Sequence, residues 1–381
     1  MEAREGKSER RRNALERHEA GLERTENREE RHARQKRHMI QQQEKDGMHV
    51  SARPSLSSAD HRPLAERCKQ IRLWFNSCQL NEPNSERHRQ NNRNREDGTC
   101  DWLTMNTLYS AWQRDVPNSP ILWLCASPGF GKSIICSRAV QLIQDSDPNA
   151  AVVYHFYQHD QRFSAGETLR ILACQLLECY GKSSNQIDDE LYLRSQRTSC
   201  SLENVQEAIT MLVKRLPKTY FFIDGLDEEV TPPTRWTNAS TVLDFLILLS
   251  IASPDTVRIW FSSQSLPCIS DKLGPHTVLD VKDQVRADVM HYLSHTMSRS
   301  NPDLDEEEKE EMLWKLQNCA EGNFLWARLM IKALQKQANN LGEMKQFIDR
   351  LPKDLDDYYR RIFSRIEQKS QQRLAWCVFF F

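Results

Sequence analysis

Short apolar runs alternate with amphipathic stretches through the middle of the chain. The apolar runs are rich in β-branched and aromatic residues and have the length of buried strands, at 121–125, 150–157, 219–224 and 257–263. The stretches between them repeat their apolar positions with the period of a helix, at 132–144, 166–180, 203–216 and 240–252. This order predicts an α/β fold of right-handed βαβ units, with a parallel sheet covered on both faces.

The pattern before this region is helical and polar. Residues 64–75 predict a helix with one apolar face, formed by Leu64, Cys68, Ile71 and Trp74 or Phe75. Residues 101–113 predict a second helix, whose inward residues would be Leu103, Leu108 and Trp112. Between the two helices, the polar stretch 81–99 predicts a loop.

Strand-like runs disappear after residue 284. Four stretches with helical periodicity follow, at 285–297, 305–320, 323–336 and 355–368. They predict an all-α subdomain behind the α/β core. Within it, "NFLWARLM" at 323–330 is interpreted as core rather than as an aromatic ligand box.

The N-terminal residues differ from the rest of the chain, because they are highly charged and carry almost no large apolar residue. They predict a solvated arm, disordered or partly helical, with an RNA-binding arm or a coiled-coil partner as the alternatives. The resulting organisation has five parts: an arm at 1–63, a helical segment at 64–118, a P-loop NTPase domain at 119–282, a helical subdomain at 283–369, and the start of a further subdomain at 370–381.

Composition narrows the class of protein. The formal net charge of -1 gives no overall attraction to nucleic acid or to an anionic membrane. The 11 cysteines are isolated and form no C-x-x-C pair, which favours reduced thiols in a cytoplasmic protein. The longest apolar stretch, 242–252, is too short to span a bilayer, and no apolar segment typical of a secretory signal follows the first methionine.

The stretch "ASPGFGKSI" after the first strand has the pattern of a phosphate-binding loop. Gly129 and Gly131 can adopt backbone angles closed to other residues, Lys132 supplies an ammonium group, and Ser133 supplies a hydroxyl for Mg²⁺. Ala126 replaces the usual first glycine, which is tolerable if its φ is negative. The predicted nucleotide-binding residues are Ala126, Ser127, Pro128, Gly129, Phe130, Gly131, Lys132, Ser133 and Ile134.

The third apolar run ends in an acid, followed by more acids, in "TYFFIDGLDEE". Asp224, at the carboxyl end of a parallel strand, is predicted to hold Mg²⁺ together with Ser133. Gly225 stands where many ATPases carry a catalytic glutamate, so Asp227 or Glu228 is expected to orient the attacking water, and Glu228 is favoured. The alternative interpretation is a strand end followed by an acidic helix cap.

A second cluster of polar residues was weighed as a metal site. His155, His159 and Asp160 lie close together in "YHFYQHD". On a strand, however, the spacing of four residues does not bring two histidines together as a helix would, so no metal site is predicted there.

Three segments carry a resemblance to a known family: "PILWLCASPGFGKS", "YFFIDGLDEE" and "RIWFSSQSLPCI". They resemble the nucleotide site of NACHT-type ATPases of the STAND class, and more closely the nephrocystin-3-like N-terminal domains of filamentous fungi. The flanking "GTCDWL", "CAEGNFLWARLMI" and "LPKDLDDYYRRIF" extend the likeness over residues 64–380. The resemblance implies an AAA+-like core that binds ATP or GTP with Mg²⁺, hydrolyses it slowly and couples nucleotide state to homo-oligomerisation. Such proteins often act in fungal self/non-self recognition and cell death, with ankyrin, WD or TPR-like repeats at the C-terminus.

Two departures from the family qualify this expectation. The family's third segment normally has an arginine that senses the γ-phosphate, whereas this chain has Gln264. A neutral amide donates a hydrogen bond but does not neutralise a developing charge, so slow or absent hydrolysis is expected. The apolar end of the chain, 378–381, suggests a truncated gene product, with a short adaptor as the alternative.

The leading interpretation is therefore a nucleotide-dependent switch with weak NTPase activity and no membrane span or nucleic-acid partner. A scaffold that holds its nucleotide without hydrolysis is the second interpretation. A P-loop kinase is the third, and it would need an arginine-rich lid that the sequence does not reveal.

Overall fold

The computed structural model describes residues 64–75, 78–114, 120–183, 189–300, 305–337 and 340–364. The predicted arm at 1–63 and the predicted further subdomain at 370–381 lie outside these residues. The described part contains one five-stranded sheet in the order β2-β3-β4-β1-β5. Every neighbouring pair in it is parallel, as the alternation of strand and helix predicts.

The strands match the predicted apolar runs and add one more. The bounds are β1 Ile121–Cys125, β2 Ala151–Phe156, β3 Thr219–Asp224, β4 Val257–Ser263 and β5 Thr277–Leu279. Strand β5 was not predicted, because its three residues are too few to give a periodic signal. Its pairing with β1 places the start of the helical subdomain beside the end of β1.

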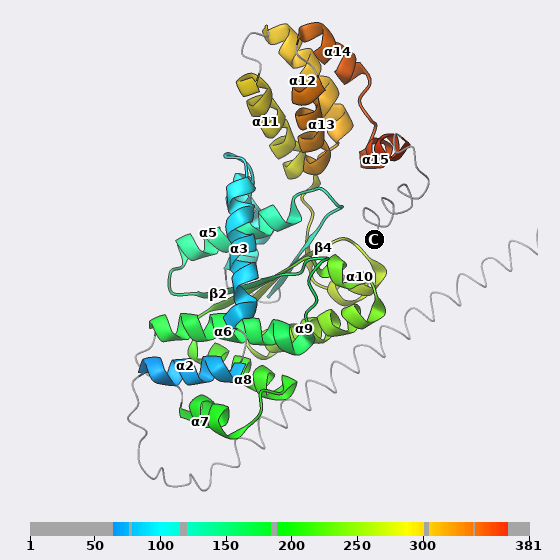
Figure 1. Cartoon of the computed structure of the whole chain (residues 1–381). Coiled ribbons are helices and arrows are strands. Elements are labelled where there is room, and N and C mark those ends of the chain that lie inside the picture. Colours follow the sequence, from blue (N-terminus) through cyan, green and yellow to red (C-terminus); the bar gives the residue numbers. More distant parts are fainter. Residues whose placement is uncertain are drawn as a thin grey trace, which may run out of the picture. The chain divides into compact units, whose positions relative to one another are not determined.

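Helices pack on both faces of the sheet (Figure 1). The bounds are α2 Leu64–Phe75, α3 Cys78–Asn94, α4 Thr107–Gln113, α5 Lys132–Ser146, α6 Ala165–Ser183, α7 Asp189–Arg197, α8 Leu202–Arg215, α9 Pro233–Ala252 and α10 Pro267–Leu273. Two 3-10 turns, Asp101–Met105 and Leu226–Glu229, precede α4 and α9. The helical subdomain contains α11 Lys282–Ser300, α12 Glu306–Ala320, α13 Phe324–Gln337, α14 Leu341–Asp349 and α15 Leu355–Ser364.

Alternate residues of each strand enter different cores. Trp123 and Phe261 belong to the core under α2, α6, α8 and α9, whereas Leu124 and Trp260 belong to the core under α4 and α5. The second core continues into α11, α12 and α13. The helical subdomain therefore shares buried apolar surface with one face of the sheet, and each fully buried large side chain contributes about 1.5–3 kcal/mol.

Three sequence-based expectations were wrong or incomplete. Residues 81–94 of the predicted loop belong to helix α3. Leu108 was expected to face inward but is 42% exposed, and the neighbouring Tyr109 is buried instead. Helix α14 was not predicted, since it has only nine residues.

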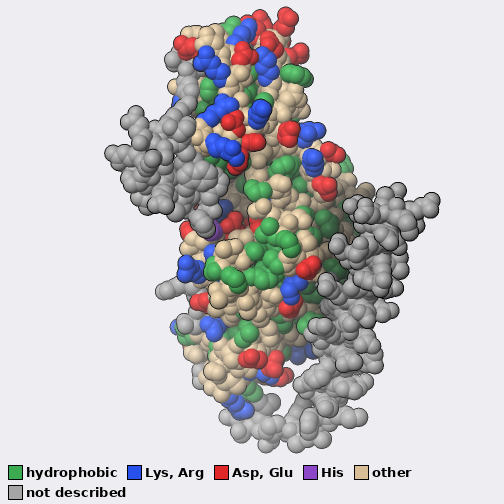
Figure 2. Space-filling model, turned by 90° about the vertical axis from the view of Figure 1, so that its right-hand side faces the viewer, with side chains coloured by type: hydrophobic (Ala, Val, Ile, Leu, Met, Phe, Trp, Pro, Cys, Tyr) green, Lys and Arg blue, Asp and Glu red, His purple; other side chains and the backbone are tan. Residues whose placement is uncertain are grey.

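None of the described helices is both long and apolar enough to cross a bilayer. Figure 2 shows acidic and basic side chains crowding the end of the protein that carries the helical subdomain, with both signs mixed. Hydrophobic side chains gather lower on the same face.

Candidate functional site

The loop between β1 and α5 has the backbone conformation expected of a phosphate-binding loop. Gly129 and Gly131 have φ values of +81° and +78°, which side-chain-bearing residues rarely adopt. Ala126 does not belong to the positive-φ residues, so the methyl group at this position causes no backbone strain. Gly131 is the N-cap of α5, whose N-terminus therefore faces the space enclosed by the loop.

Lys132 is folded back over the loop. Its ammonium Nζ donates to the carbonyl oxygens of Ala126 at 3.1 Å and Ser127 at 3.4 Å. The same nitrogen lies 3.8 Å from Asp227 Oδ2. The single cation of the predicted loop thus has weak local partners, which an anion bound in the loop can replace.

Ser133 and Asp224 meet as predicted from the sequence. Ser133 Oγ donates to Asp224 Oδ2 at 2.5 Å, and Ser262 Oγ donates to Oδ1 at 2.5 Å. Asp224 is buried, and burial raises the pKa of its carboxyl group, while the two serine hydrogen bonds oppose that shift. A hydroxyl and a carboxylate at the carboxyl edge of the sheet are an oxygen donor set that fits Mg²⁺. Ser133 and Asp224 would hold the ion directly or through water.

Asp227 and Gln264 form a second contact beside the loop. Gln264 Nε2 donates to Asp227 Oδ2 at 2.8 Å. The other oxygen of Asp227, Oδ1, is buried and has no hydrogen-bond partner among the described residues. An unsatisfied carboxylate oxygen in a polar cavity needs a water or an ion, which also fits an occupied site.

Glu228 is positioned differently from Asp227. Its side chain is 42% exposed, and Oε2 lies 3.8 Å from His159 Nδ1. Burial, and then the charge of Asp227, raise the pKa of its carboxyl group. A raised pKa makes a carboxylate a better proton acceptor at neutral pH. Glu228 therefore has the freedom and the basicity that the predicted role requires, whereas Asp227 is held by Gln264 and Lys132.

The part of the chain that contains the loop and these acids matches a known protein family. Residues 98–264 match the family model "Nephrocystin 3, N-terminal". This segment of the chain is similar to the nephrocystin 3 N-terminal family. This match confirms the resemblance identified from the sequence, and it ends at Gln264, the residue that replaces the expected arginine.

One curated relative is the vegetative incompatibility protein HET-E-1 of Podospora anserina. It is 23% identical over an alignment of 306 residues that covers 74% of this chain and 21% of HET-E-1. This chain thus corresponds to about a fifth of that protein's length.

Two solved structures have a similar fold. The Walker-type ATPase paby2304 of Pyrococcus abyssi is 14% identical with a TM-score of 0.43, covering 74% of this chain and 79% of that one. PCH-2 of C. elegans is 11% identical with a TM-score of 0.36, covering 74% and 68%. Both TM-scores are below 0.5, and nothing about function follows from them.

Within the matched residues 98–264, Gly225 explains why no glutamate follows Asp224. Its φ is +77°, and a Cβ atom there would lie 2.8 Å from the backbone oxygen of Tyr157. Because the obstacle is backbone, it has little freedom to move aside. A larger residue at 225 is therefore excluded, and the next acids along the chain are Asp227 and Glu228.

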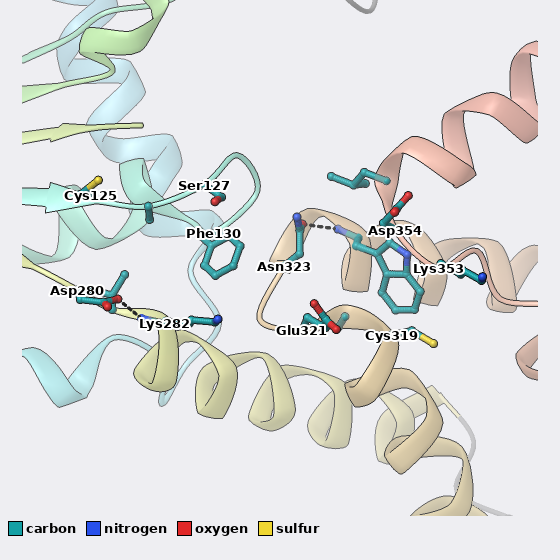
Figure 3. A pocket seen from close by; sticks show the side chains of 15 residues that line it. Cys125, Ser127, Phe130, Asp280, Lys282, Cys319, Glu321, Asn323, Lys353 and Asp354 are labelled. Atoms are coloured by element: carbon teal, nitrogen blue, oxygen red, sulfur yellow. Dashed lines mark hydrogen bonds between the residues drawn. The ribbon is translucent and has the colours of Figure 1, made fainter. Parts of the chain in front are cut away.

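A segment outside the matched residues 98–264 completes the loop. Asn323 Nδ2 donates to the oxygen of Pro128 at 3.1 Å, and the amide of Leu325 donates to Gly129 O at 3.3 Å. A Cβ at Gly129 would lie 2.3 Å from Asn323 Oδ1, so the glycine is also needed for this close approach. Figure 3 shows Asn323 on its turn opposite Phe130 of the loop.

The contact between Asn323 and the loop was not predicted, although the sequence contains one indication of the turn that carries it. Residues 323–330 were interpreted as core, and Trp326 is buried as expected. Asn323, however, caps α13 by accepting a hydrogen bond from the amide of Trp326 at 2.9 Å. A Gly-Asn pair directly before an apolar run indicates a helix start, so the turn could have been predicted. Its contact with the phosphate-binding loop could not.

Two cavities open on either side of the phosphate-binding loop. The first, about 920 Å³, contains the glycines of the loop, Lys132, Ser133, Asp224, Asp227, Glu228 and Gln264. The second, about 420 Å³, lies between the loop and the helical subdomain (Figure 3). Its walls include Phe130, Lys282, Asn323, Trp326 and Asp354. Trp326 Nε1 is buried and lacks a hydrogen-bond partner among the described residues.

His155 has different surroundings from His159 and Asp160. His155 is buried on β2 and shares a hydrogen bond with the side-chain amide of Asn84 at 3.2 Å. His159 and Asp160 are exposed. Within the part of the chain that the structure describes, no group of three or more His, Cys, Asp and Glu residues is arranged to hold a metal ion.

Proposed function

We propose that this protein binds a purine nucleoside triphosphate, ATP or GTP, together with Mg²⁺ in the phosphate-binding loop, and that it acts as a switch. The single observation that supports this most is the hydrogen bond of 2.5 Å between Ser133 and Asp224, directly beside Lys132. It supports the assignment of a metal-binding pair and a phosphate-binding cation to one strand edge.

Each residue has a stated role in this proposal. Backbone amides of the loop and the N-terminus of α5 bind phosphate oxygens, and Lys132 leaves its two carbonyl partners to neutralise their charge. Bound Mg²⁺ supplies charge neutralisation for the phosphates. Glu228 accepts a proton from the attacking water, which its raised pKa favours. The nucleoside would extend into the second cavity, beside Trp326 and Phe130.

The switch is proposed because the loop contacts two parts of the chain at once. Asn323 and Leu325 of the helical subdomain bond to the loop backbone. A ligand that changes the loop therefore changes what those two residues contact. By analogy with the relative that is named as a vegetative incompatibility protein, the proposed context is fungal self/non-self signalling with oligomerisation on activation in the cytoplasm.

The test measures binding and turnover of Mg²⁺–ATP and Mg²⁺–GTP. Wild-type protein should bind at least one of them, and Lys132→Ala should weaken binding at least about tenfold, since it removes a charged contact. Lys272→Ala is the matched control, because Lys272 pairs with Asp244 on α9 and lies outside both cavities. Absence of binding by the wild-type protein would reject the proposal.

A second function, a scaffold that holds its nucleotide without hydrolysis, has one observation in its favour. Gln264 brings an amide rather than a cation to the site and binds Asp227. The variant Glu228→Gln separates the two: slow turnover that disappears in this variant supports the NTPase switch. Tight binding with equal background turnover in both proteins supports the scaffold.

A further inference from the structure

A triphosphate bound in the cavity of about 920 Å³ around the loop would need more positive charge than residues 98–264 supply. Within the loop, Lys132 supplies the positive charge and lies 3.8 Å from the carboxylate of Asp227, and the same cavity also contains the carboxylates of Asp224 and Glu228. A triphosphate adds further negative charge, of which Mg²⁺ cancels a part. The arginine expected at position 264 is a glutamine, so the missing positive charge has to come from elsewhere.

Four arginines line the same cavity, and two of them are already engaged. Arg95 donates to the carbonyl oxygen of Thr99 at 2.8 Å and lies 3.9 Å from Asp101. Arg93 lies 3.7 Å from Glu86, and its side chain is 71% exposed. The other two, Arg87 and Arg328, make no hydrogen bond or ion pair with any other described residue.

Arg87 is placed by helix α3. One turn further along the helix, Asn91 is buried and donates to Ser133 O at 3.2 Å and Ser137 Oγ at 2.9 Å. Residues four apart lie on the same helix face, so Arg87 is beside the contact between α3 and the start of α5. Figure 1 shows α3 running alongside the sheet and α5 towards the helical subdomain.

Arg328 is placed in the same way by helix α13. One turn before it, the ring of Phe324 lies 3.8 Å from where a Cβ on Gly131 would be. Asn323 and Leu325 fix this end of α13 to the loop by hydrogen bonds. The guanidinium of Arg328 also lies near Tyr292, another residue of the cavity wall. Both arginines therefore sit one helical turn from a residue that contacts the phosphate-binding segment.

We propose that Arg87 and Arg328 bind the terminal phosphate of the nucleoside triphosphate and supply the positive charge that Gln264 does not. This inference rests on the proposed function and adds residues to the same site. Both arginines lie outside residues 98–264, so the terminal phosphate would connect α3, the loop and α13. A diphosphate would leave both arginines without their partner, and the triphosphate state would be recognised by two helices distant in sequence.

The experiment compares equilibrium binding of Mg²⁺–ATP, in a non-hydrolysable form, with that of ADP. Arg87→Ala and Arg328→Ala should each raise the Kd for the triphosphate about tenfold, with a change below about threefold for ADP. The double variant should lose about a hundredfold on the triphosphate alone. Arg89→Ala and Lys332→Ala are the matched controls: Arg89 pairs with Glu82 and Glu86 on the outer side of α3, and Lys332 is exposed one turn beyond Arg328.

The outcomes separate this inference from the proposed function. If the wild-type protein binds both nucleotides and the two arginine variants bind the triphosphate equally well, the arginine inference is wrong and the nucleotide site stands. Equal losses for ATP and ADP also overturn it, because the arginines would then act elsewhere than at the terminal phosphate. If the wild-type protein binds neither nucleotide, both proposals fail.

Discussion

Asp227 and Gln264 contact each other beside the phosphate-binding loop. Gln264 donates one hydrogen bond to Asp227 Oδ2, and that oxygen lies 3.8 Å from Lys132 Nζ. The carboxylate would therefore compete with phosphates bound in the loop, as we propose, for the ammonium group. An arginine at 264 would pair with Asp227 and also bring a fixed positive charge, whereas glutamine provides only the hydrogen bond.

The variant Gln264→Arg is expected to hydrolyse its nucleotide faster than the wild-type protein. Arginines that contact the transferred phosphoryl group raise turnover by large factors, so an increase of at least about tenfold in kcat is expected. Phosphate release under saturating nucleotide measures it, with Gln264→Ala as the control that removes the hydrogen bond without adding charge. An unchanged rate in the arginine variant would mean that Gln264 is not what limits hydrolysis.

Helix α3 completes the free edge of the sheet at β2. Asn84 Oδ1 accepts from the amide of Phe156 at 2.9 Å, and Gln175 of α6 bonds to both the amide and the carbonyl of Tyr154 at 2.8 and 2.9 Å. Side-chain amides thus take the place of a neighbouring strand. This satisfies backbone groups that would otherwise be buried without a partner or offered to another chain.

These contacts explain why the sequence predicted a loop at 81–99. A helix on the surface of a core usually shows an apolar stripe, but α3 packs through buried asparagines, among them Asn84 and Asn91. Polar residues that repeat with the period of a helix do not by themselves indicate a buried helix face. The strand-loop-helix around Lys132 was predictable because its signal is local, whereas the contacts of Asn91 and Asn323 depend on segments 42 and 195 residues away.

The variant Asn84→Ala tests whether α3 is part of the folded core. It removes the acceptor of the Phe156 amide and the partner of His155, both buried, so an expected loss in unfolding free energy is about 2–4 kcal/mol. Gln90→Ala on the exposed side of the same helix should change stability by less than about 0.5 kcal/mol. Urea unfolding followed by circular dichroism measures both. Equal stability of the two variants would contradict the role of Asn84.

The whole molecule carries several buried ionisable groups whose pKa shifts act in opposite directions. Burial raises the pKa of Asp224 and of Asp288, so each favours the folded state below its unfolded pKa and loses that contribution as the pH rises through its folded pKa. Burial lowers the pKa of His88 to about 4 and of His155 to about 3. These histidines favour the folded state above their unfolded pKa, and the contribution is lost as the pH falls. The loss of unfolding free energy as the pH falls should therefore come from these histidines rather than from Asp224 and Asp288.

His155 provides the sharpest test of this balance. Asn84 Oδ1 accepts from the Phe156 amide, so its Nδ2 group donates to Nδ1 of His155, which must be unprotonated. Between pH 7 and pH 4 the wild-type protein should lose about 3 kcal/mol of unfolding free energy through this group, because burial lowers the pKa of His155 from that of an ordinary histidine to about 3.

In His155→Gln the side-chain oxygen can accept the same hydrogen bond without titrating, so the fall in unfolding free energy between pH 7 and pH 4 should shrink by about that amount. Gln90→Ala, at an exposed position with no titratable side chain, should leave the slope unchanged. Urea unfolding at a series of pH values measures the slopes, and parallel curves for wild type and His155→Gln would show that the acid sensitivity arises elsewhere.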